Sequence, residues 1–171
     1  LHLEKGSAFA ARGVMLPPYD TAATLERLAA TLDAYPASTV MCLGDSFHDS
    51  RAAERMSAVD RETLSILQED RDWLWLNGNH DPVIADCFGG KILREITVSG
   101  ITFRHEPTTS PVTHEVAGHL HPAARVSFHG HVIRRPCFVG NGKRLVMPAF
   151  GTYAGGLNVL DDAFAPLFGH E

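Results

Sequence analysis

Four short segments of this 171-residue chain place metal-competent side chains next to a glycine or directly after an apolar stretch. They are Gly44-Asp45, Gly78-Asn79-His80-Asp81, His105 in Phe103-Arg104-His105, and Gly118-His119-Leu120-His121. The ends of strands commonly carry metal and acid–base chemistry in α/β proteins. Because the chain also contains ten histidines, we expect a site built from imidazole and oxygen ligands.

Two of the segments are weak evidence alone and two are moderate, and the combination carries the prediction. A lone Asp45 is more often a turn or cap residue, and a lone His105 is more often structural. Nitrogen and oxygen ligands without thiolates suit Mn²⁺, Fe or Zn²⁺ better than Ca²⁺. Two such cations about 3.5–4 Å apart, bridged by Asp45, can clamp a phosphate and ionise a water. His80 is followed by Asp81, which favours an imidazole oriented by a carboxylate.

The composition predicts one soluble globular domain over residues 1–171. Apolar residues make up 44% of the chain and charged residues 20%, with a formal net charge of −5. No apolar run approaches the roughly 20 residues that cross a bilayer, so we expect a cytoplasmic protein without a membrane partner. The three cysteines form no CxxC motif, which argues against a disulfide framework. A local basic group either meets a phosphate backbone or is a solvated surface: Arg134, Arg135, Lys143 and Arg144.

Hydrophobic periodicity predicts alternating helices and strands followed by hairpins, an α/β protein with helices outside two packed sheets. Helices are expected over 21–35, with Leu25, Leu28 and Leu32 on one face and Asp20 or Thr21 as the cap, and over 60–69, with Leu64 and Leu67 inward. Buried strands are expected at 39–43 and 73–76. Hairpins are expected from 92–98 with 101–105, and from 137–139 with 144–147. His129-Gly130-His131 is interpreted as a loop.

The ordered motifs resemble those of calcineurin-like metallophosphoesterases, whose pattern is D-x-H, G-D, G-N-H-D/E, H and G-H-x-H. His2 takes the place of the first histidine. Longer stretches of the sequence, including 42–49, 134–139 and 148–151, resemble those of the bacterial ligase-associated DNA-damage-response endonucleases. When these stretches are included, the resemblance extends to about Asp161. It implies a four-layer α/β/β/α sandwich.

The resemblance also implies the role of each site residue. One cation would be bound by His2, Asp45 and His121, and the other by Asp45, Asn79, His105 and His119. His80 would contact the phosphate and assist the leaving oxygen, with Asp81 orienting it. The family's aspartate two residues before His2 is absent, as is its first strand. We therefore expect an N-terminally truncated domain with a weaker first metal site.

The implied reaction is hydrolysis of a phosphodiester by a hydroxide activated between two divalent metal ions, with Mn²⁺ expected first and Fe, Zn²⁺ or Ni²⁺ as alternatives. The expected enzyme is a DNA-repair endonuclease associated with DNA ligase and helicase. A small-molecule phosphodiesterase or nucleotide phosphatase is a second hypothesis, which the negative charge favours. A non-catalytic repair-complex module is the third. The expected substrate contacts are His48, Arg134 and Arg135.

Overall fold

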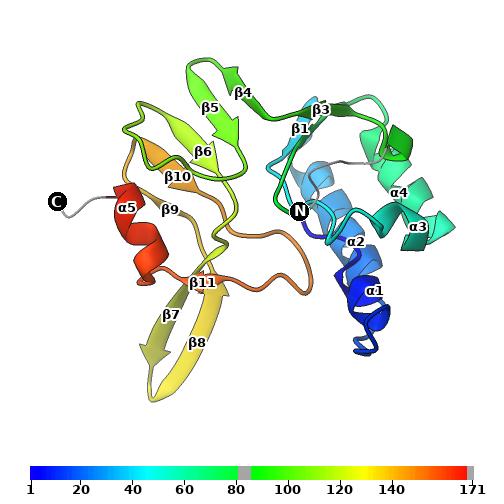
Figure 1. Cartoon of the computed structure of the whole chain (residues 1–171), viewed down its shortest axis with the longest axis horizontal. Helices are drawn as coiled ribbons and strands as arrows, with labels where there is room; N and C mark the ends of the chain where they lie inside the picture. Colours follow the sequence, from blue (N-terminus) through cyan, green and yellow to red (C-terminus); the bar gives the residue numbers. More distant parts are fainter. Residues whose placement is uncertain (81–85, 169–171) are drawn as a thin grey trace. The chain divides into compact units, whose positions relative to one another are not determined.

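The computed structural model describes residues 1–80 and 86–168, and the chain forms two compact units (Figure 1). The first unit comprises Leu1–Arg94 and Phe150–Tyr153. The second unit comprises Glu95–Ala149 and Ala154–Glu171. Both units contain helices and strands, so the predicted α/β class is confirmed. None of the helices within the described residues combines the length and apolar character needed to cross a bilayer.

Helices of the first unit are α1 (Lys5–Ala10), α2 (Asp20–Ala34), α3 (Ala52–Arg55) and α4 (Ala58–Gln68). The predicted apolar face of α2 is confirmed, because Leu25, Leu28 and Leu32 are all buried. The inward residues of α4, Leu64 and Leu67, are also buried as predicted. Ser57 caps α4, where its hydroxyl accepts the Asp60 N–H.

The sheet of the first unit is parallel, in the order β1 (Thr39–Cys42), β2 (Asp72–Leu76) and β3 (Lys91–Leu93). The first two confirm the strands expected from short apolar runs, but only β2 is largely buried as expected, whereas β1 buries Cys42 alone. Trp73 and Trp75 of β2 join a core with Phe47 and with Phe88, which belongs to the short 3₁₀ helix η1 (Asp86–Phe88). The rings of Phe47 and Phe88 stack with centroids 4.2 Å apart.

The single strand predicted at 92–98 is wrong, because the chain changes sheet at Arg94. β3 pairs in parallel with β2 in the first unit. β4 (Glu95–Val98) instead pairs antiparallel with β5 (Ile101–Arg104) in the second unit. Hydrophobic alternation continues through such a junction, so periodicity alone cannot reveal it. The hairpin of β4 and β5 is itself confirmed.

The second unit contains a five-stranded sheet in the order β4-β5-β6-β10-β9, with β6 at Glu115–Ala117, β9 at Val139–Gly140 and β10 at Arg144–Val146. The predicted second hairpin is confirmed as an antiparallel β9–β10 pair. Its first strand starts later than expected, at Val139. The 3₁₀ helix η2 (Asp162–Phe164) and α5 (Ala165–Phe168) bury Phe164 and Leu167 against Val146.

A second sheet in this unit has the order β11-β7-β8, with β11 at Leu157–Asn158, β7 at Pro122–Phe128 and β8 at His131–Pro136. Sequence reasoning missed its hairpin. His129 and Gly130 form the two-residue turn, with φ of 49° and 77°, as turns between twisted antiparallel strands require. His131 already belongs to β8, so the loop expected at 129–131 is shorter than predicted.

The basic group predicted from the sequence is divided by the fold. Arg134, Arg135 and Lys143 are exposed, whereas Arg144 is buried. The Arg144 guanidinium pairs with the buried Glu115 carboxylate and also donates to the carbonyls of Thr108, Ser110 and Leu167. Its charge is therefore used inside the second unit, which removes it from any surface that could meet a phosphate backbone.

Candidate metal centre

Asp45 lies just after β1 in an unusual backbone conformation. Gly44 and Asp45 have φ of 81° and 48°, and the Asp45 side chain is only 4% exposed. Non-glycine residues rarely adopt positive φ, and those that do cluster at functional sites. Asp45 Oδ1 accepts a 2.8 Å hydrogen bond from the His80 backbone N–H. The carboxylate is thus fixed in place at the end of the strand.

His2 is buried in the first unit because the segment around it is hydrogen-bonded on both sides. Leu3 N donates to Ser46 O at 2.9 Å, and His48 N donates to Leu3 O at 3.0 Å. His2 N itself donates to Phe150 O at 3.0 Å. One His2 ring nitrogen and one Asp45 carboxylate oxygen lie within 4.8 Å of each other. The two side chains can therefore bind the same cation.

Gly151 allows this close approach to His2. A Cβ atom at Gly151 would lie 2.9 Å from both the Cβ and the carbonyl oxygen of His2, a distance that real Cβ atoms do not show. The same segment is anchored from the other side, since Thr152 N donates to the buried Thr24 Oγ1 at 3.1 Å. Lys5 Nζ donates to Tyr153 O at 2.9 Å. The 150–153 segment therefore packs closely against His2 and helps to position it.

Three imidazoles form one group in the first unit: His2, His48 and His80. The rings of His48 and His80 stack with centroids 5.5 Å apart, and the His2 ring lies 6.2 Å from that of His80. Burial, and then the charge of His80, lower the pKa of His48 below its usual value.

Asn79 and His80 are exposed at the end of the segment that follows β2. Exposure suits a side chain that must reach a substrate, and the backbone bond from His80 to Asp45 fixes where that side chain starts. Asp81 lies outside the described residues, so its predicted orienting role stays a prediction.

The second unit brings His105 and His119 together. His119 Nδ1 and His105 Nε2 are 3.2 Å apart, and the rings meet edge to face at 78°. Gly118 N donates to His105 O at 2.9 Å, which holds the two segments side by side. Ring nitrogens converging in this way either share a proton or point their lone pairs at one cation.

The backbone bends locally at His119 and His121. Both residues have positive φ, of 65° and 47°. Leu157 N donates to His121 O at 3.0 Å, which ties the second histidine to β11. Gly156 packs so closely there that a Cβ would lie 2.3 Å from His121 O. His2, which is buried, and His121, which is half-buried, each thus have a glycine against the backbone.

The predicted substrate contacts Arg134 and Arg135 lie on β8, where both side chains are exposed. The Arg134 guanidinium donates to the Gly156 carbonyl, beside the His121 backbone. Arg135 Nη1 donates to Arg134 O at 3.0 Å. Arg134 is therefore a neighbour of a predicted ligand in the same unit.

Sequence reasoning missed the residues that hold the segment after His2. Asp20 or Thr21 was expected to cap α2, but no side chain caps it, and the buried Asp20 carboxylate instead accepts the Lys5 and Gly6 N–H groups of α1, both at 3.0 Å. Glu4 has φ of 60°, and its N–H donates to Thr21 Oγ1 at 2.9 Å. Each partner lies at least 14 residues away, so no local signal marks these contacts.

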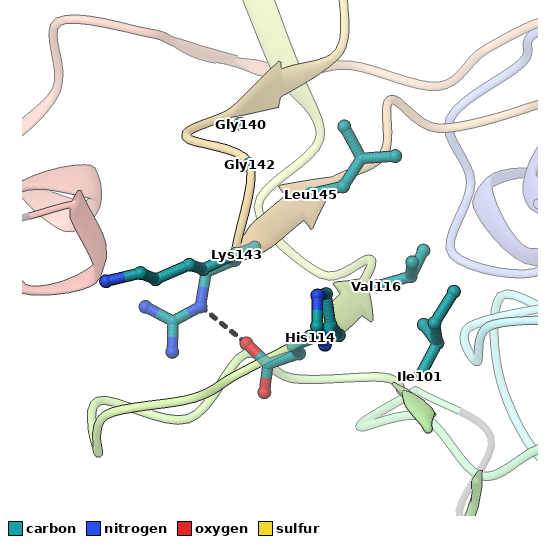
Figure 2. A pocket seen from close by; sticks show the side chains of 9 residues that line it. Ile101, His114, Val116, Gly140, Gly142, Lys143 and Leu145 are labelled. Carbon is teal, nitrogen blue, oxygen red and sulfur yellow. Dashed lines mark hydrogen bonds and ion pairs between the residues drawn. The ribbon is translucent and has the colours of Figure 1, made fainter. Parts of the chain in front are cut away.

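A pocket of about 420 Å³ lies on the five-stranded sheet of the second unit (Figure 2). Ile101, Val116 and Leu145 line it, and the Glu115 and Arg144 charges beside them are paired with each other. Among the residues that the structure describes, none of the predicted metal ligands lines it, and neither does His80. The pocket is therefore separate from the chemistry predicted for the histidine groups.

The donor set of the two groups suits a hard or borderline divalent cation. The predicted ligands offer imidazole nitrogens, one carboxylate and one amide oxygen, and three of them stand in left-handed backbone. Such ligands fit Mn²⁺, Fe or Zn²⁺. The three cysteines are not among the predicted ligands: Cys42 is buried, Cys87 is exposed and Cys137 is half-buried.

No family model matches the sequence, and no curated protein matches it significantly. Among solved structures, the chain is similar to the crystal structure of the Pseudomonas putida nuclease MPE, with a TM-score of 0.72 and 27% sequence identity. The similarity covers 95% of this chain and 77% of that one. It supports the predicted α/β sandwich.

Proposed function

We propose that this protein is a metal-dependent phosphodiesterase that cleaves DNA, of the calcineurin-like metallophosphoesterase family. Hydrolysis of nucleic acid is supported by the similarity to a nuclease over nearly the whole chain. Metal dependence and the family are supported by the ordered motifs from His2 to His121 and by the two histidine groups. The single observation that carries it is the positive φ shared by Asp45, His119 and His121.

We propose that the two ligand groups act together on two cations, with Asp45 shared between them. The motif order of the resembled family joins the groups in this way. Within the first unit, Asp45 and His2 offer ligand atoms within 4.8 Å. Within the second, His105 and His119 do the same. Mn²⁺ is the first choice, with Fe, Zn²⁺ and Ni²⁺ as alternatives for these donors.

Bound cations would supply charge neutralisation at the phosphate and an activated water. The chain's own residues perform the remaining tasks. His80 is exposed and anchored through its backbone to Asp45, so its imidazole can donate a proton to the leaving oxygen. The His48 ring stacks on that of His80. Arg134 offers a positive charge to a neighbouring phosphate.

Mn²⁺-dependent cleavage tests this proposal. Purified protein loaded with Mn²⁺ is expected to cleave single-stranded DNA and bis-p-nitrophenyl phosphate, and a chelator is expected to stop both reactions. Hydrolysis of phosphomonoesters or cyclic nucleotides in place of DNA would favour the small-molecule alternative. The net charge of −5 also favours that alternative, because a polyanion binds less readily to a negatively charged protein. A repair-complex module without activity would cleave none of these substrates.

A further inference from the structure

A groove of about 420 Å³ lies between α2 and α4, which pack against each other in the first unit (Figure 1). Ala22, Ala23 and Leu25 of α2 line it, together with Val59 of α4. Among the residues that the structure describes, none of the predicted metal ligands lines it. Because alanine side chains are short, the backbone of a third helix can approach α2 closely there.

Large apolar side chains stand exposed beside this groove. Tyr19, which lines it, is 69% exposed, and Val59 is 71% exposed. Ile66 lies seven residues after Val59 on the same face of α4 and is 54% exposed. Thr63 lies between them, and its hydroxyl donates to Val59 O at 2.9 Å, so this polar atom is bonded within the helix. Exposed apolar side chains that adjoin one another in this way are typical of an interaction surface.

The charges around the groove are acidic. Glu26 lines it, and Asp33 lies seven residues further along the same exposed face of α2. Glu62 is exposed on the face of α4 that carries Val59. Within the described part of the chain, none of these three carboxylates forms an ion pair. Three acidic side chains therefore meet solvent beside apolar surface.

The arginines of the two helices are engaged elsewhere. The Arg27 guanidinium lies over the Phe150 ring, 4.3 Å from its centroid. Arg61 donates to Met56 O at 3.3 Å. The surrounding sequence is acidic as well, because residues 1–94 contain fourteen aspartates and glutamates against nine lysines and arginines. The whole net charge of −5 is thus found in this part of the chain.

This combination of shape and charge selects the occupant. A polyanion is repelled by the acidic side chains, whereas a basic partner is attracted to them. A groove between two helices with exposed apolar side chains is the kind of surface that binds an amphipathic helix. A second copy of the chain is a poor source of that helix. In residues 1–80 and 86–168 the helices of at least eight residues are α2 and α4, and both carry more acidic than basic residues.

We propose that the α2–α4 groove binds a basic amphipathic helix of a partner protein. The apolar side chains of that helix lie against Ala22, Ala23 and Val59, and its lysines or arginines lie beside Glu26 and Glu62. This interaction surface goes beyond the proposed hydrolysis, because it needs neither a bound cation nor a substrate.

The probe for this surface is a labelled helical peptide of about 18 residues, with leucines at the i, i+3, i+4 and i+7 positions and lysines elsewhere. Its binding to the full chain is measured by fluorescence anisotropy in the presence of a chelator. We expect saturable binding that weakens in about 0.5 M NaCl, because salt screens exposed charges. A scrambled peptide of the same composition, and a peptide with glutamates in place of the lysines, should each bind at least about tenfold more weakly.

Two kinds of substitution in the groove test its contacts. Val59→Ser should weaken peptide binding about tenfold, because it removes apolar surface from the contact. Ala22→Trp fills the groove and should weaken binding at least as much. Glu26→Lys with Glu62→Lys should weaken binding about tenfold at low salt and less at high salt. All four positions are exposed, so the variants are expected to fold.

The matched controls lie in the second unit. Val98→Ser removes an exposed valine there, and Glu106→Lys with Asp162→Lys makes the same change in net charge as the groove variant. Both controls should bind the peptide within about twofold of the wild type. Absence of saturable binding, equal affinity for the scrambled peptide, or equal losses in groove and control variants would overturn the proposal. Self-association in sedimentation velocity that Val59→Ser abolishes would overturn it too, because the groove would then be an interface between copies.

Discussion

The Oδ1 atom of Asp45 accepts a 2.8 Å hydrogen bond from the backbone N–H of His80. This bond joins the ends of two parallel strands, since Asp45 follows β1 and His80 follows β2. The bond fixes the orientation of the Asp45 carboxylate. The predicted ligand and the predicted acid are therefore positioned by the same contact.

His80 is predicted to act in the reaction and not in metal binding. His80→Ala keeps its backbone N–H, so the contact with Asp45 remains. We expect kcat for phosphodiester cleavage to fall about 10²- to 10⁴-fold, which is the usual contribution of a general acid. Mn²⁺ affinity, measured by isothermal titration calorimetry, should stay within about threefold. A fall in Mn²⁺ affinity as large as the fall in kcat would contradict this role.

His119 is predicted to bind a cation together with His105, whose ring nitrogen lies 3.2 Å away. His119→Ala should weaken Mn²⁺ binding by at least about tenfold. His114→Ala is the matched control, because His114 is an exposed histidine of the same unit, and its Mn²⁺ affinity should be unchanged. Equal Mn²⁺ affinities of the two variants, measured by calorimetry, would show that the His105–His119 pair is structural.

Asp20 is predicted to stabilise the segment that follows His2. Asp20→Ala leaves the Lys5 and Gly6 N–H groups without their acceptor, at a cost of about 1–3 kcal/mol in the free energy of unfolding. Asp20→Asn keeps an acceptor oxygen and should lose less. Asp33→Ala, an exposed aspartate on the same helix, is the control. Urea unfolding curves that coincide for Asp20→Ala and Asp33→Ala would reject this role.

Asp49 is predicted to make stability depend on pH in acid. Burial alone would raise its pKa, but the hydrogen bonds from the Arg55 side chain and the Arg51 N–H outweigh it and hold the pKa below the usual value of 3.8. The unfolded chain therefore binds more protons, so this contribution is present above pH 3.8 and is lost as pH falls through the lower folded value. In urea unfolding between pH 5 and 3, Asp49→Asn should lose less stability than the wild type. An unchanged slope would contradict the assignment.

Much of the fold could be predicted because its signals are local. The apolar spacing of α2 and the short apolar run of β2 are readable from neighbouring residues. The junction at Arg94 and the β7–β8 hairpin were missed, because neither a change of sheet nor a His-Gly turn breaks the hydrophobic pattern. Local signals therefore identify elements more reliably than they identify pairing partners.

The candidate site could be proposed in part for the same reason. The motifs single out Asp45, His80 and His119, and two of these, Asp45 and His119, stand in left-handed backbone. The supporting residues could not be predicted, because Asp20 and Gly151 contact the His2 segment from distant positions in the sequence. Only the folded chain reveals such contacts.

The most direct test of the account is hydrolysis of bis-p-nitrophenyl phosphate by the purified protein before and after removal of metal. The account predicts turnover with Mn²⁺, its loss in chelator, and its recovery when Mn²⁺ is added back. His80→Ala should show little turnover under every condition. A folded protein that binds Mn²⁺ but hydrolyses neither this substrate nor DNA would contradict the central claim.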